Sequence, residues 1–214
     1  MKRKALSFLL ILCLIIGMVP VAALADSDPV VEVNGQQFSD LETAMSQIQT
    51  ICDAGKTASV KLLGDASWNT EQSLSIPEGY TVTLDLAGHA VSGSTTGPLL
   101  VNYGNLTIED STAGEDSHGI GHGRIYTTNL EAQGRHAVQN YGTLTINGGI
   151  FGDNNTNTTD ANDQAQRGNA LRNLGTAIIN GGAFTACDNY VNNGYAYAIA
   201  NGDSNHPDAS LTIH

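Results

Sequence analysis

Basic side chains are scarce in this sequence. Its 214 residues include nine lysines and arginines against 21 aspartates and glutamates, a formal net charge of −12. Three of the basic residues, Lys2, Arg3 and Lys4, open the chain, and without them six basic residues face 21 acidic ones, a net charge of −15. Such a chain repels nucleic acid and anionic membranes. We therefore expect no nucleic-acid partner, and no polyuronate partner unless metal ions bridge the two.

Cysteines and long apolar runs are scarce as well. Of the three cysteines, Cys13 lies in the apolar run 5–19, and Cys52 and Cys187 are too few and too far apart to form a disulfide framework. Two buried thiols are the simpler interpretation, although their pairing stays open. The run itself is shorter than the ~20 residues of a membrane-spanning helix.

That run has the flanks of a secretory signal peptide. It follows the basic Lys2-Arg3-Lys4 and precedes Ala23-Leu24-Ala25, an A-x-A cleavage site. We therefore expect residues 1–25 to be a signal peptide and the mature chain to begin at Asp26. The expected location is secreted or cell surface, with no membrane insertion after cleavage.

The rest of the chain is organised around a repeat. The segment His136 to Phe151 reads HAVQNYGTLTINGGIF, and related copies are centred on the asparagines Asn102, Asn140, Asn173 and Asn201. These asparagines lie about 30 to 40 residues apart, a period typical of solenoids. Apolar side chains alternate with polar ones on both sides of each asparagine, the pattern of strands with one buried face.

Each copy therefore predicts two short strands joined by an Asn-x-Gly corner. Neither strand can bury its apolar face alone, so the copies must stack as a parallel β-helix, a solenoid of the all-β class. We expect the asparagine side chains to point inward and to hydrogen-bond between layers. Gly104, Gly142 and Gly175 suit the corners because glycine reaches positive φ without steric cost. The residues expected to be buried are Val138, Leu144, Ile146, Leu171, Ile179 and Ile199; those expected to face outward are Gln139, Thr145 and Arg172.

A non-repeating segment precedes these copies. It contains an entry strand at 30–33, a helix from Leu41 to near Gly55 with Ser39 as its N-cap, and strands at 58–63, 74–76 and 80–86. We assign it as a cap on the apolar end of the solenoid. The expected organisation is thus a signal peptide at 1–25, a cap with the first β-helix layers at 26–93, and repeated coils at 94–214. The chain stops midway through a copy, from which we expect a fragment of a longer protein.

The order of a helix, ASVKLLGD, a Pro-Glu-Gly turn at 77–79, YTVTLDLAGHAVSG at 80–93 and repeated NYGxLTI resembles the right-handed parallel β-helix proteins of the pectin-lyase-like superfamily. Within it, the chain is most similar to secreted repeat proteins on the surface of Gram-positive gut bacteria. The resemblance implies the right-handed β-helix fold. It does not select an activity, because members range from polysaccharide lyases and glycoside hydrolases to adhesins.

Catalytic candidates are incomplete. Gly121-His122-Gly123 resembles an element of the polygalacturonase-like glycosidases, but the acidic pairs that precede it in that family are absent. Asp110, Glu115 and Asp116 share a loop that we interpret as solvated. The arginines Arg124, Arg135, Arg167 and Arg172 lie in no recognisable lyase motif. We therefore assign no catalytic residue.

Two surface features suit ligands. Asp153, Asn155 and Asn157 alternate like calcium ligands, with Asp160 and Asp163 following, but the turn glycine and closing glutamate of such loops are Thr158 and Gln164. We assign no metal or cofactor, and calcium stays a minor alternative. Tyr103 and Tyr141 occupy one column of the repeat, which indicates either a glycan-binding row or a structural aromatic stack. Other tyrosines near the later loops are Tyr126, Tyr190, Tyr195 and Tyr197.

Two function classes remain. The favoured one is a non-catalytic extracellular β-helix module, adhesin-like or carbohydrate-binding, with a polysaccharide or glycoprotein as partner. The alternative is the N-terminal part of a polysaccharide lyase or glycoside hydrolase whose active site lies in downstream layers.

Overall fold

A computed structural model describes residues 28–51, 55–111, 123–128, 136–152, 167–185, 187–188 and 197–214. The expected signal peptide at 1–25 and the residues of the calcium alternative lie outside these residues, as do Cys52, Glu115, Asp116, His122, Arg135, Tyr190 and Tyr195. Of Arg167 and Cys187 only the backbone is described. Within the described part of the chain, the search for a helix long and apolar enough to cross a membrane found none.

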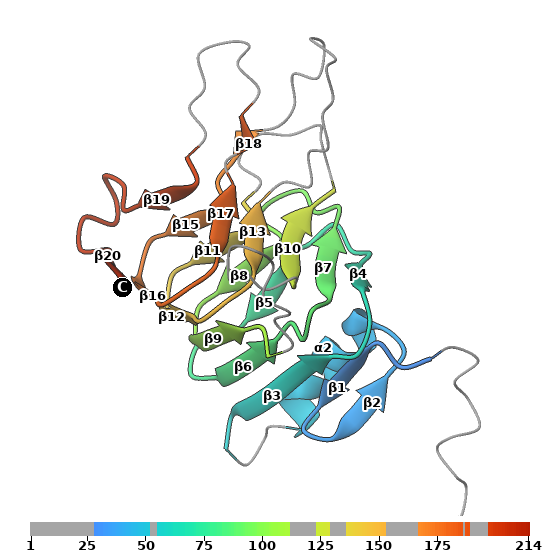
Figure 1. The fold of residues 1–214 in the computed structure, drawn as a ribbon. Helices are drawn as coiled ribbons and strands as arrows, with labels where there is room; N and C mark the ends of the chain where they lie inside the picture. The colour runs from blue at the N-terminus through green and yellow to red at the C-terminus, as the bar shows by residue number, and fades with distance from the viewer. Residues whose placement is uncertain are drawn as a thin grey trace, which may run out of the picture.

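The described chain is mostly β, and its strands form three sheets with parallel pairing (Figure 1). The largest has the order β2-β1-β3-β6-β9-β12-β16-β20, and we call it the eight-stranded sheet. Its strands are β1 (Val31–Val33), β2 (Gln36–Phe38), β3 (Thr57–Leu62), β6 (Thr81–Asp85), β9 (Asn105–Glu109), β12 (Thr143–Ile146), β16 (Thr176–Ile179) and β20 (Ser210–Ile213). Only the pairs of β1 with β2 and with β3 are antiparallel in this sheet.

Two further sheets of five strands are parallel throughout. The β4 sheet contains β4 (Ala66–Trp68), β7 (Ala90–Gly93), β10 (Arg124–Thr127), β13 (Ile150–Gly152) and β17 (Ala183–Thr185). The β5 sheet contains β5 (Leu74–Ile76), β8 (Leu100–Asn102), β11 (Val138–Asn140), β15 (Leu171–Asn173) and β19 (Ile199–Asn201). The short strands β14 (Arg167–Gly168) and β18 (Cys187–Asp188) pair antiparallel.

Apart from that short pair, the chain enters the three sheets in rotation from β3 onward. The copies centred on Asn102, Asn140 and Asn173 thus supply three strands each, one more than expected, and the described part of the Asn201 copy supplies β19 and β20. The additional strand lies in the β4 sheet, and in the Asn140 and Asn173 copies it follows the Gly-Gly corner. Gly149 and Gly182 have φ of 101° and 106° there, and the strands they open stack Phe151 on Phe184 with ring centroids 5.0 Å apart.

The N-terminal segment packs as a hairpin and one helix. Asn34 and Gly35, at φ of 49° and 83°, turn β1 into β2. The helix α2 (Leu41–Ile51) buries Leu41, Ala44 and Ile48 in the core. Its N-cap is Asp40, because Asp40 Oδ1 accepts a hydrogen bond from Thr43 N at 2.7 Å. The prediction of Ser39 as N-cap was therefore wrong by one residue. The helix is described as far as Ile51, and residues 52–54, which precede the predicted end near Gly55, lie outside the described residues.

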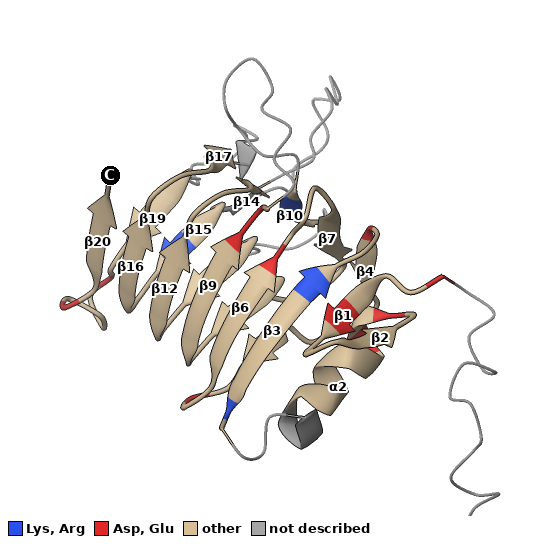
Figure 2. Cartoon of the chain, turned by 60° about the horizontal axis from the view of Figure 1, so that its bottom comes forward, with Lys and Arg blue, Asp and Glu red and all other residues tan. Residues whose placement is uncertain are grey.

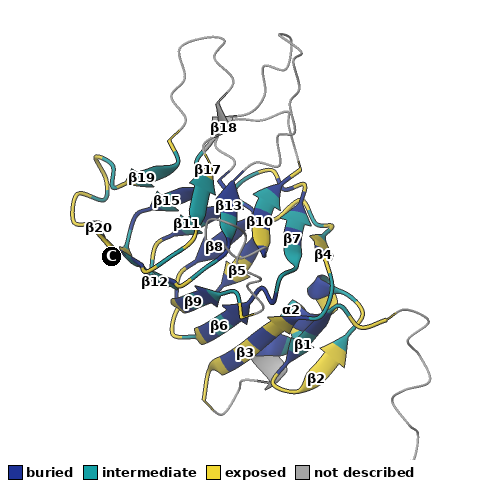
Figure 3. Ribbon diagram, in the orientation of Figure 1, coloured by how far each residue is buried: buried dark blue, intermediate teal, exposed yellow. Residues whose placement is uncertain are grey.

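The register of the sheets follows the repeat. Val138 pairs with Leu100 and Leu171, and Leu144 pairs with Leu106 and Ala177. The inward side chains form one continuous core (Figure 3). Burial is confirmed at Val138, Leu144, Ile146, Leu171 and Ile179. It was wrong for Ile199, which is half-buried because it lies in the edge strand β19 of the described β5 sheet.

The asparagine ladder is confirmed. Nδ2 of Asn102 donates to Oδ1 of Asn140, Nδ2 of Asn140 to Oδ1 of Asn173, and Nδ2 of Asn173 to Oδ1 of Asn201, each at 2.7 Å. The first three side chains are fully buried. Because a buried amide without partners is costly, this repeated bond fixes the asparagine at each corner.

The corner glycines serve a different purpose from the one expected. Gly104, Gly142 and Gly175 are not among the glycines with positive φ. A Cβ on Gly142 would instead lie 2.1 Å from the carbonyl oxygen of Gly104, and one on Gly175 would lie 2.3 Å from that of Gly142. Close approach of successive corners, rather than backbone conformation, therefore requires glycine here.

Charged residues of the eight-stranded sheet gather near its first strands (Figure 2). Lys61 of β3 has Glu32 of β1 and Asp85 of β6 as its register neighbours, and Glu109 of β9 follows Asp85. A single cation between two acidic neighbours reduces repulsion across this acidic chain.

Candidate functional site

The two tyrosines of the repeat column form an exposed stack. Tyr103 and Tyr141 each follow a ladder asparagine, and their rings lie parallel, with centroids 5.1 Å apart and an interplanar angle of 4°. Tyr103 is 49% exposed and Tyr141 is 37% exposed. The predicted stacking is thus confirmed. In the next copy the same position holds Leu174, which is buried.

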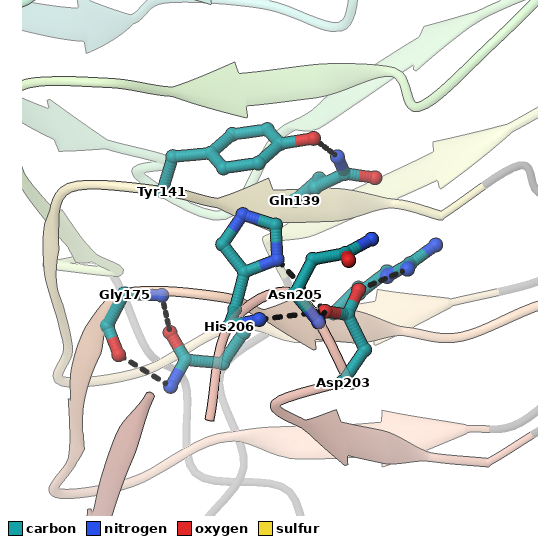
Figure 4. Close-up of polar contacts among 8 residues, drawn as sticks. Gln139, Tyr141, Gly175, Asp203, Asn205 and His206 are labelled. Carbon is teal, nitrogen blue, oxygen red and sulfur yellow. Dashed lines mark hydrogen bonds and ion pairs between the residues drawn. The ribbon is translucent and has the colours of Figure 1, made fainter. Parts of the chain in front are cut away.

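A loop between β19 and β20 extends this stack (Figure 4). It brings the His206 ring against Tyr141, with centroids 5.7 Å apart and planes tilted by 60°. On the other side, Gln139 Nε2 donates a hydrogen bond to the Tyr141 hydroxyl. We call Tyr103, Tyr141, Gln139 and His206 the tyrosine surface. On this surface the polar atoms of Gln139 and His206 lie beside the two tyrosine rings, and the strands β8 and β11 hold those rings in position.

Asp203 holds the loop in place. Its Oδ1 accepts hydrogen bonds from Asn205 N and His206 N, both at 2.9 Å, and from His206 Nδ1 at 2.8 Å. Its Oδ2 pairs with Arg172 Nη2 at 2.9 Å. These bonds, led by that from the His206 side chain, lower the pKa of Asp203 to about 2. Arg172 was predicted as an outward surface residue and is half-exposed, but sequence reasoning did not find its partner.

The described acidic residues near the candidate catalytic loop support turns. Asp110 Oδ1 accepts a hydrogen bond from Gly88 N, and its Oδ2 accepts one from Gly123 N, both at 2.7 Å. Asp85 is buried, and it accepts hydrogen bonds from Ala87 N and from the backbone and hydroxyl of Ser111. Both carboxylates are thus engaged by the protein itself. Whether Asp110 approaches Glu115, Asp116 or His122 lies outside the described residues.

The remaining candidates from the sequence do not form a common site among the described residues. Arg124 is exposed on β10 and Tyr126 is half-buried on the same strand. Tyr197 is 53% exposed and precedes β19. Among the described residues, no group of three or more histidine, cysteine or acidic side chains is placed to hold a metal ion.

One buried histidine was not anticipated. His136 is 5% exposed, and its Nδ1 accepts a hydrogen bond from Asn169 N at 2.9 Å. In the next layer Asn169 Oδ1 accepts the same kind of bond from Tyr197 N. Burial, together with the charge of Arg172, lowers the pKa of His136 to about 4. The ring is therefore neutral at physiological pH and acts as a structural acceptor.

A scan against protein-family models found no match to this chain, and neither did a search of curated proteins or a search of solved structures.

Proposed function

We propose that this protein is an exported, non-catalytic module, built as a right-handed parallel β-helix, that binds carbohydrate on the tyrosine surface. The rotation of strands through three sheets with matched register supports the β-helix architecture. The right hand is the one that parallel strand connections almost always take. The resemblance to the pectin-lyase-like superfamily and the leader at 1–25 support an extracellular place for this fold.

The observation that carries the binding function is the exposed Tyr103–Tyr141 stack. Sugar rings present C–H faces beside hydroxyl groups, and a tyrosine offers an apolar ring with a polar end. Stacking and the bond from Gln139 fix these rings before a ligand arrives. Little side-chain entropy is then lost on binding.

Three of the described carboxylates, those of Asp85, Asp110 and Asp203, favour binding over catalysis. A glycoside hydrolase needs two carboxylates about 5 to 9.5 Å apart across the scissile bond. Asp85, Asp110 and Asp203 instead accept several hydrogen bonds each from the protein's own backbone and side chains. They act as turn and loop supports.

The test is binding of the secreted full chain to pectate, arabinan and mucin glycans. Tyr103→Ala or Tyr141→Ala should weaken retention by at least about tenfold, equivalent to 1.4 kcal/mol. Tyr197→Ala is the matched control, since Tyr197 is more exposed than either stacked tyrosine and lies outside the stack. Unchanged binding in both stack variants would refute the tyrosine surface as the site.

The same incubations test the enzyme alternative, and a separate measurement tests export. Release of reducing ends or unsaturated products above background would replace the binding function with a catalytic one. N-terminal sequencing of protein from the culture medium should begin at Asp26; protein that stays inside the cell with its leader intact would contradict export.

A further inference from the structure

A second concave surface lies far from the tyrosines in sequence, where β4 and β7 end. Its volume is about 310 Å³, within the range of small-molecule sites in proteins. The lining residues are Ser67, Trp68, Asn69, Thr70, Glu71, Ser92, Gly93, Ser94 and Thr128. We call this space the Trp68 cleft.

The walls of the cleft are fixed by hydrogen bonds from outside it. Trp68 packs against the core, and its Nε1 donates to the carbonyl oxygen of Gln72 at 2.7 Å. The carbonyl oxygen of Glu71 accepts bonds from both N and Oγ1 of Thr96. Asn69 N donates to the Glu42 carboxylate on α2. The segment from β4 to β5 is therefore tied to the helix and to the loop after β7.

The base of the cleft requires a glycine. A Cβ on Gly93 would lie 2.8 Å from the carbonyl oxygen of Trp68 and 2.7 Å from Cδ1 of Leu99. The carbonyl oxygen of Gly93 also accepts a bond from Thr128 N at 2.8 Å. Gly93 thus brings three strand ends close together and leaves a hollow in front of them.

Most side chains that line the hollow are polar, and four of them keep their hydrogen-bonding capacity. Within the described part of the chain, the hydroxyls of Ser67, Ser92 and Ser94 and the carboxylate of Glu71 make no side-chain hydrogen bond. Ser67 and Ser92 are register partners on adjacent strands. Their hydroxyls therefore stand side by side at the strand spacing of ~4.8 Å.

We propose that the Trp68 cleft binds an uncharged sugar. Several hydroxyls beside one indole match the alternating polar and apolar faces of a pyranose ring. The lining contains no lysine, arginine or histidine, so it offers no partner for a phosphate, sulfate or uronate group. Glu71 adds repulsion toward such anions and an acceptor for sugar hydroxyls. The cleft shares its ligand class with the proposed function but stands on different residues.

Trp68 makes this proposal directly testable, because it is the single tryptophan of the chain. Its fluorescence in the protein spanning residues 26–214 is titrated with galactose and N-acetylglucosamine, with galacturonate as the anionic probe and glucosamine as the amine probe. We expect a saturable change in emission with at least one neutral sugar. Galacturonate should bind at least about tenfold more weakly.

Two serine variants supply the matched comparison. Ser92→Leu places a larger side chain in the cleft from a half-buried outward position and should weaken sugar binding at least about tenfold. Ser75→Leu makes the same change at an exposed position of β5 outside the cleft and should leave the titration unchanged. Circular dichroism of both variants must match that of the parent.

The outcomes separate this site from the tyrosine surface. Tyr103→Ala should leave the Trp68 titration unchanged. If the protein binds glycans through its tyrosines but no sugar changes the Trp68 emission, the cleft proposal is overturned and the proposed function stands. Saturation by glucosamine only would assign the cleft to amines and would also overturn it. Equal losses in the Ser92 and Ser75 variants would show that the cleft does not hold the ligand.

Discussion

Removing the Asn140 side chain should destabilise the protein far more than the loss of a small polar group at a surface would. Its Nδ2 donates to Asn173 Oδ1 at 2.7 Å, to the carbonyl oxygen of Thr176 at 3.0 Å and to that of Gly142 at 3.1 Å. Its Oδ1 accepts the bond from Asn102. The side chain is fully buried, so water does not replace these partners.

The magnitude follows from what Asn140→Ala leaves behind. A net hydrogen bond is worth about 1 kcal/mol, and each buried partner left unsatisfied adds about 1 to 3 kcal/mol. Gly142 O keeps its bond from Thr176 N, and Asn102 keeps two other acceptors. Asn173 Oδ1 is left with one long contact, 3.4 Å from Gly175 N. With one net bond lost and Asn173 Oδ1 left without a good partner, we expect a loss of about 2 to 4 kcal/mol in the free energy of unfolding.

Urea unfolding followed by circular dichroism measures this loss, and Asn147→Ala is its control. Asn147 and Asn180 form a similar amide pair at 2.9 Å on the surface, where both side chains are exposed. Asn147→Ala should cost less than about 0.5 kcal/mol. A neutral Asn140→Ala, or equal losses at the two positions, would refute the argument that the buried ladder fixes the corners.

The two remaining predictions concern the strand register and a buried histidine. Leu144→Ala should cost about 2 to 5 kcal/mol of unfolding free energy as a core truncation, and Thr145→Ala less than about 0.5 kcal/mol; equal losses in urea would contradict the register. Because burial lowers the pKa of His136 from 6.5 to about 4, its contribution to stability is complete above pH 6.5 and is lost as the pH falls toward 4, by at most about 3 kcal/mol. His136→Asn keeps an acceptor for Asn169 N and should flatten this pH dependence; an unchanged slope would show that another group is responsible.

The repeat predicts the register of the strands because equivalent positions in successive copies hold the same types of residue. Asn102, Asn140 and Asn173 each lie two residues after a large apolar residue and two residues before a glycine, so their pairing follows from the sequence alone. The strands of the β4 sheet were not predicted, because their position relative to the asparagine is not constant: β13 begins four residues after β12 ends, whereas β10 begins 15 residues after β9 ends. The corner glycines were found, but their reason was not, since the distance between Gly104 and Gly142 depends on stacking.

The candidate sites were likewise predictable where they lie within the repeat and not predictable where they lie outside it. Tyr103 and Tyr141 share a repeat column, and their stacking follows from that column alone. Asp203 and His206 lie in a loop outside the repeat, and no spacing pattern links them to Arg172 or Tyr141. The Trp68 cleft was missed because its lining comes from three separate strand ends with no shared motif.

The asparagine ladder also has a direction. Every amide donates toward the Asn201 end, so the side-chain dipoles of the four layers add rather than cancel, and each bond polarises the next. At both ends of this row the amide bonds to the backbone: Asn102 Oδ1 accepts from Gly104 N in the buried layer, and the exposed Asn201 donates from Nδ2 to the carbonyl oxygen of Ala209. The row is therefore a small counterpart of a helix dipole, with its positive end in the layer where the carboxylate of Asp203 follows two residues later.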